Sequence, residues 1–142
     1  MSLARHLELQ TQTVTHLVEL LELERRALAQ ARIEGEKLSE LTACKQAALL
    51  KLEQLEAIRA GAQLKLGYGS GRKGALKAAQ DADCVAAWKQ LQALAQRARS
   101  LNTTNGGTLS LRMSYNQRIV SFLNSVIGSK LYGPDGRAQR DS

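Results

Sequence analysis

Apolar residues recur at seven-residue intervals near the start of the chain, and this recurrence constrains the fold more than any other feature. The main row consists of Leu7, Val14, Leu21 and Leu28, with Leu3, Leu17 and Ala31 at companion positions. Such a stripe predicts an amphipathic helix over about residues 3–32, roughly 45 Å long at about 1.5 Å per residue. Gln10 and Glu24 interrupt the companion row, so the pattern departs from a regular leucine zipper.

A second apolar stripe follows Glu34-Gly35 and predicts a helix of similar length over about residues 36–66. Its members are Leu38, Leu41, Ala48, Leu52, Leu55, Ala62 and Leu66. Two long helices joined by a short connection lie antiparallel. We therefore expect a helical hairpin. The glycine-rich sequence after it predicts a flexible loop over residues 67–80.

A third stripe extends from about residue 84 to residue 127 and keeps its phase across Gly106-Gly107. Its members are Leu91, Leu94, Ala98, Asn102, Asn105, Leu109, Met113, Asn116, Val120, Leu123 and Ile127. At about 100° per residue they share one amphipathic face. Because each glycine costs about 1 kcal/mol relative to alanine in a helix, we expect the helix to continue through the pair or to bend there. An unbroken helix would span about 66 Å, so part of it must overhang the hairpin, fold back or find another partner.

The composition agrees with an all-α fold, because aromatic residues make up only 4% of the chain and there is one proline. The sequence contains no apolar run of the length that spans a membrane and no signal-peptide core at its start. We therefore expect a cytoplasmic protein without membrane insertion. Its domain would be a helical bundle over residues 1–128, built from the hairpin and the long C-terminal helix. A flexible tail would follow over residues 129–142.

No residue pattern indicates catalysis, a cofactor or a metal site. His6 and His16 lie outside any metal-binding motif, and neither cysteine belongs to a Cys/His cluster. Three glutamates on the first helix, Glu19, Glu22 and Glu24, are most simply a solvated acidic face. We therefore expect a protein that is not an enzyme and that carries no cofactor.

The two halves of the chain differ in charge. Residues 1–60 carry eight Lys/Arg and nine Asp/Glu, whereas residues 61–142 carry twelve and four. A basic half fits nucleic acid, an acidic protein partner or a solvated surface. The basic residues are scattered and few aromatic residues lie between them for base stacking, so we expect no nucleic-acid binding.

Three stretches of the chain resemble the FlgN family of flagellar type III export chaperones. The sequence "LTACKQAALLKLEQLE" (41–56) is similar to the family's second helix, with Cys44-Lys45 where glutamate-lysine is more usual. The sequence "LNTTNGGTLSLRMSYNQRIVSFL" (101–123) resembles the family's LNxxNG…NQ block, and "LYGPDG" (131–136) resembles its C-terminal LYGxDG. Together with the first helix, the resemblance covers nearly the whole chain.

The resemblance implies a cytosolic chaperone of long antiparallel helices, with no enzymatic activity. Its partners would be the first and third hook-associated proteins, held before export, and the flagellar export gate with its ATPase apparatus. We expect the C-terminal stripe to cover a helix of the substrate, with Gly106 and Gly107 as a hinge. The substrate-binding residues would be Asn102, Asn105, Leu109, Met113, Asn116, Val120, Leu123 and Ile127. The apolar pair Leu131-Tyr132 would dock on the export gate.

Two alternatives stay open at this stage. The C-terminal stripe also fits the core of the bundle, either permanently or only until a substrate binds. The heptads would equally suit a helical coiled-coil adaptor or oligomerisation protein without a role in export.

Overall fold

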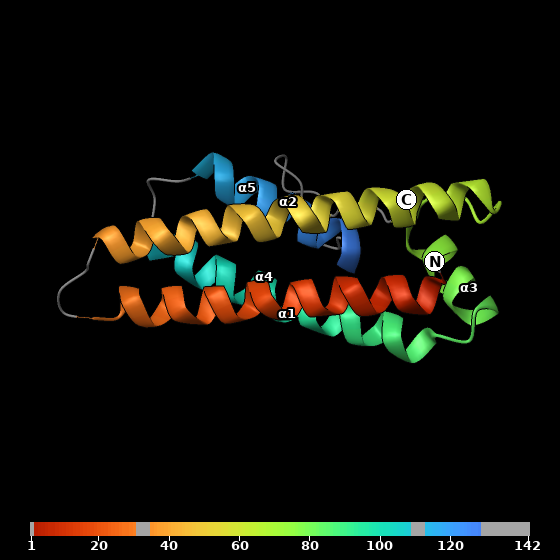
Figure 1. The fold of residues 1–142 in the computed structure, drawn as a ribbon, viewed down its shortest axis with the longest axis horizontal. Helices are drawn as coiled ribbons and strands as arrows, with labels where there is room; N and C mark the ends of the chain where they lie inside the picture. The colour runs from red at the N-terminus through yellow and green to blue at the C-terminus, as the bar shows by residue number, and fades with distance from the viewer. Residues whose placement is uncertain (1, 31–34, 109–112, 129–142) are drawn as a thin grey trace.

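The computed structural model describes residues 2–30, 35–108 and 113–128, with backbone alone for residues 107, 108 and 113–117. These residues form five α-helices and no strand, which confirms the all-α prediction (Figure 1). None of the described helices combines the length and the apolar character needed to cross a membrane. The helices are α1 (Leu3–Leu28), α2 (Gly35–Lys65), α3 (Gly71–Asp81), α4 (Val85–Thr108) and α5 (Met113–Ile127).

Helices α1 and α2 lie antiparallel along the length of the molecule, as the hairpin prediction required (Figure 1). Helix α1 begins after Ser2, whose Oγ accepts a hydrogen bond from the backbone N–H of Arg5. Arg25 and Arg26 occupy its last turn, where positive charge complements the helix dipole. The sequence therefore determines both the start and the end of this helix through local interactions.

The predicted loop over residues 67–80 is wrong, because residues 71–81 form α3. The turn before it uses Gly67, Gly69 and Gly71, which all have positive φ angles of 75–90°. Gly74 has a different purpose, since a Cβ there would lie 2.5 Å from Gln63 Nε2 and 2.5 Å from the Tyr68 carbonyl oxygen. Glycine at this position allows α3 to approach the end of α2 closely.

The helix predicted over residues 84–127 is divided into two helices, and part of it folds back, which is one of the three arrangements that its length left open. Helix α4 continues through both glycines to Thr108, and α5 then returns alongside α4 (Figure 1). Residues 109–112, which connect the two helices in the sequence, lie outside the described residues. The reversal follows from the length argument, because a straight helix would extend beyond the hairpin with its apolar face uncovered.

Helix α1 packs most extensively against α4 and then against α2, while α5 packs mainly on α4. Trp88 of α4 is buried, and the Arg59 guanidinium of α2 lies 5.1 Å from its ring centroid, so Trp88 packs against the hairpin. A smaller apolar cluster fills the end of the hairpin near its connection. The largest fully buried apolar side chains of the main core are Leu7, Leu17, Leu21, Leu49, Leu52, Leu91, Ile119 and Leu123.

Candidate functional site

The apolar face of α5 lies in the core of the bundle. Ile119, Leu123 and Val126 are at most 1% exposed, and Phe122 is 6% exposed. The apolar residues of the C-terminal stripe that the structure describes in α5 are therefore covered, and they do not form a free apolar surface. The structure instead agrees with the alternative in which this stripe forms part of the core.

Polar contacts hold α5 at both edges. Arg99 of α4 donates from Nη1 to Asn124 Oδ1 over 3.3 Å, and Arg118 Nη2 lies 2.6 Å from Glu53 Oε1 of α2. At the end of α5, Arg72 Nη1 of α3 donates to the Ile127 carbonyl oxygen over 2.8 Å. These contacts are exposed or half-buried, so the apolar face accounts for most of the binding of α5 to the bundle.

Asn102 and Asn105 are buried in α4, only 2% and 3% exposed. The Asn105 Nδ2 group donates to the Leu21 carbonyl oxygen and to Glu24 Oε1, each over 2.9 Å. The other carboxylate oxygen of Glu24 lies 2.7 Å from Lys45 Nζ of α2. This buried polar network therefore joins α1, α2 and α4 directly before the two glycines.

The network corrects two predictions made from the sequence. Glu24 is 2% exposed and paired, so it does not belong to a solvated acidic face. Asn105 faces α1, so it does not lie on one continuous surface with the apolar residues of α5. The sequence signal was present, because Glu24 interrupts the stripe of the first helix and Asn105 interrupts that of the fourth.

Some buried polar atoms of this region have no hydrogen-bond partner among the described residues. They are Oδ1 of Asn102, Oδ1 of Asn105 and both amide atoms of Gln10. The core of the bundle therefore includes polar side chains of both α1 and α4.

The predicted site residues divide among several places. Asn102, Asn105, Gly106 and Gly107 lie in α4, whereas Met113, Asn116, Val120, Leu123 and Ile127 lie in α5. Val120 and Ile127 are half-buried, and Leu123 is fully buried. Leu109, Leu131 and Tyr132 lie outside the described residues.

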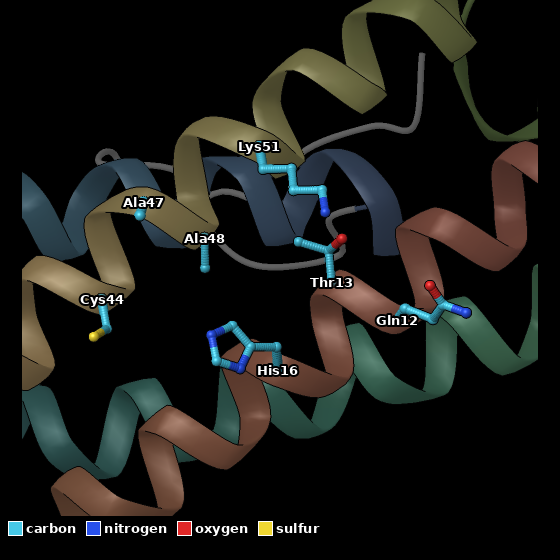
Figure 2. Close-up of a pocket in the computed structure, with 7 residues that line it drawn as sticks. All are labelled: Gln12, Thr13, His16, Cys44, Ala47, Ala48 and Lys51. Carbon is cyan, nitrogen blue, oxygen red and sulfur yellow. The ribbon is translucent and has the colours of Figure 1, made fainter.

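His6 is buried, and its Nε2 lies 2.7 Å from the Leu55 carbonyl oxygen. His16 is exposed and lines an open pocket of about 360 Å³ between α1 and α2 (Figure 2). Cys44 and Lys51 of α2 line the same pocket. Within the described part of the chain, no three His, Cys, Asp or Glu side chains are grouped as a metal site would require.

An ion pair on the surface of the bundle joins α1 to α4. Glu22 Oε1 of α1 lies 2.6 Å from Arg97 Nη2 of α4, and Glu22 Oε2 lies 2.8 Å from Arg25 Nη2. The hydrogen bond from Arg25, with the positive charges of Arg25 and Arg97, lowers the pKa of the Glu22 carboxyl. This pair is solvated, so it contributes little to stability.

A family model described as FlgN protein matches residues 1–140 of the chain. No curated protein and no solved structure gives a significant match. The matched region covers nearly the whole chain, including all five described helices. The protein therefore belongs to the FlgN family of flagellar export chaperones.

Proposed function

We propose that this chaperone binds the first and third hook-associated proteins in the cytoplasm through its C-terminal helical segment. It would keep these junction proteins from assembling prematurely and deliver them to the flagellar export gate. Family membership supports the general role of an export chaperone. The choice of the C-terminal segment is supported by the way α5 is attached to the rest of the bundle.

In this proposal α5 is a displaceable cover of the bundle core. Among the described side chains of α5 four apolar residues are buried, Ile119, Phe122, Leu123 and Val126, each worth about 1.5–3 kcal/mol, or roughly 6–12 kcal/mol together. A substrate that displaces α5 must replace this burial. An amphipathic terminal helix of a junction protein offers an apolar face of the same kind and would lie between α4 and α5, covering both.

The buried polar network defines where such a movement would begin. Asn105 is fixed to α1 through Leu21 and Glu24, and Lys45 extends the network to α2. Gly106 and Gly107 follow directly. The anchored part of α4 would therefore stay with the hairpin, while the two glycines act as the hinge for the segment beyond them.

The observation that carries this proposal is that α5 buries its apolar face mainly against α4, just after the anchored Asn105. A covalent lock between α4 and α5 tests it. Arg99→Cys and Asn124→Cys replace two residues whose side chains are in contact, in a Cys44→Ser background. A short bismaleimide then joins the two new thiols, and binding of each purified junction protein is measured by calorimetry.

We expect the locked chaperone to bind at least roughly tenfold more weakly, equivalent to about 1.4 kcal/mol. The same double-cysteine protein without cross-linker should bind as the parent does. Each single-cysteine variant treated with the reagent controls for modification alone. Unchanged affinity of the fully locked protein would show that α5 does not move when the substrate binds.

Leu131 and Tyr132 would contact the export gate, as the family resemblance implies. They follow α5 closely in the sequence, so displacement of α5 would also change the position of this pair relative to the hairpin. Substrate capture and gate docking would then be linked through one segment of the chain.

A further inference from the structure

Helix α2 carries a second apolar row, on the side that faces away from the bundle. Leu50 and Leu64 are 54% and 56% exposed, although both belong to a long, well-formed helix. Ala43 and Ala57 continue the same seven-residue spacing and are also exposed. We call this face the outer row of α2, formed by Ala43, Leu50, Ala57 and Leu64.

The outer row repeats over three heptads, or about 31 Å of helix. The inner side of α2 is already covered, since Leu41, Leu49 and Leu52 are buried against the other helices. A helix with apolar residues on two sides is typical of one that is covered on both sides. The spacing is that of a coiled-coil seam, so a helix is the partner that fits it.

The order of large and small residues in the outer row points to a second copy of the same helix. Alanine and leucine alternate through positions 43, 50, 57 and 64. Positions 43 and 64, and likewise positions 50 and 57, lie symmetrically about a point between residues 53 and 54. Antiparallel pairing about this point places each leucine against an alanine of the other copy, whereas parallel pairing places leucine against leucine and leaves gaps between alanines.

The charges beside the outer row favour the same arrangement. Glu40 and Lys65 are exposed at opposite ends of one edge of the row, almost symmetrically about the same point. Antiparallel pairing places Glu40 of each copy near Lys65 of the other, whereas parallel pairing places like charges together. On the other edge, Glu53 near the centre is already neutralised by Arg118 at 2.6 Å.

Lys51 is the remaining cation near the centre of the row. Figure 2 shows its side chain directed towards Thr13 of α1, so its ammonium group is turned towards the pocket between α1 and α2. It therefore does not oppose the approach of a second helix. We propose that the outer row of α2 is a self-association surface on which two copies of this chaperone pair through antiparallel α2 helices.

Sedimentation of the full chain over a concentration series tests the pairing. Three heptads bury less than the roughly 800 Å² per partner of a standard interface, so the dimer is reversible and its fraction rises with concentration. Leu50→Glu combined with Leu64→Glu yields a monomer with unchanged helical content. Leu23→Glu is the matched control, because Leu23 is an exposed leucine on α1, 41% exposed, outside the row. It leaves the dimer intact.

One introduced cysteine at a time, in a Cys44→Ser background in which the buried Cys84 remains, tests the direction of pairing. Gln54→Cys lies beside the symmetry point and forms an intermolecular disulfide under mild oxidation. Leu64→Cys lies about 31 Å from the Leu64→Cys site of the other copy in the antiparallel pair, so it forms none. A parallel pair would cross-link at both positions.

A monomeric parent protein at every concentration would overturn the proposal, as would a dimer that survives the double glutamate variant or a disulfide at position 64. Two of the contrary outcomes identify another occupant. If the parent is monomeric and the double glutamate variant loses junction-protein binding, the row belongs to the substrate. If the parent is monomeric and a dimer forms only after Leu131→Ser and Tyr132→Ser are introduced into the full chain, the chain's own C-terminal residues cover the outer row in the parent.

Discussion

Replacing Lys45 by methionine removes the cation from a carboxylate that the bundle has buried. In the structure Lys45 Nζ lies 2.7 Å from Glu24 Oε2, and the two side chains are 4% and 2% exposed. Loss of one partner from a buried pair costs about 3–5 kcal/mol, because the remaining charge has neither water nor a counter-ion. Methionine preserves most of the volume, so the effect measures the charge and not a cavity.

The size of this effect depends on the charge that remains on Glu24. We expect Lys45→Met combined with Glu24→Gln to recover most of the lost stability, since a glutamine oxygen can still accept the hydrogen bond from Asn105. Arg25→Met is the matched control, because its partner Glu22 lies at the surface. That change should lower the free energy of unfolding by less than about 1 kcal/mol.

Urea unfolding followed by far-UV circular dichroism measures all three variants. The midpoint should fall for Lys45→Met with little change in the slope of the transition, and it should return in the double variant. If Lys45→Met costs under about 1 kcal/mol, the pair is solvated in solution. The polar network would then not anchor α4.

Three further experiments test other parts of the structure. Burial, with a smaller contribution from the negative charge of Asp83, raises the pKa of the Cys84 thiol. The exposed Cys44 should therefore react first with Ellman's reagent at neutral pH, and equal rates would contradict the burial of Cys84. Alanine at both Gly106 and Gly107 should raise the free energy of unfolding by about 1 kcal/mol per site, because both glycines lie within α4. The same change should weaken junction-protein binding measured by calorimetry, and unchanged binding would argue against a hinge there. Tyr132→Ala should leave substrate binding intact and reduce secretion of the junction proteins, and a loss of substrate binding would contradict separate roles for the two segments.

The sequence predicted the hairpin because Leu7, Val14 and Leu21 repeat with a spacing that only a helix satisfies. It did not predict α3, because the density of glycines in residues 67–74 outweighed a short apolar pattern. Ala75 and Ala79, which are buried in the core, carry that pattern. Glycine count alone cannot separate glycines that make a turn from a glycine that permits close packing, as Gly74 does.

The reversal between α4 and α5 could not be predicted from the phase of the stripe. Residues such as Ala98 and Leu123 stay in phase along the sequence whether the chain continues or folds back, since phase carries no information about direction. The length of the predicted helix was the better signal, because it exceeded the hairpin that had to cover it.

The buried network is a property of three helices together. Glu24 has Glu19 and Glu22 nearby in the sequence, which is typical of a solvated helix face. Its partners Lys45 and Asn105 come from other helices, so only the packed structure shows that this carboxylate is buried. The interruption of the apolar stripe at Glu24 was the one local indication of this arrangement.

The central claim is that α5 rests on α4 in the free chaperone and leaves it when a junction protein binds. Gln96 of α4 and Ser121 of α5 are both exposed, so each can carry a spin label in a Cys44→Ser background. Double electron–electron resonance then measures the distance between the two labels. We expect one short, narrow distance in the free protein and a longer or broader distribution after saturation with a purified hook-associated protein. An identical distribution in the saturated complex would contradict the displacement of α5.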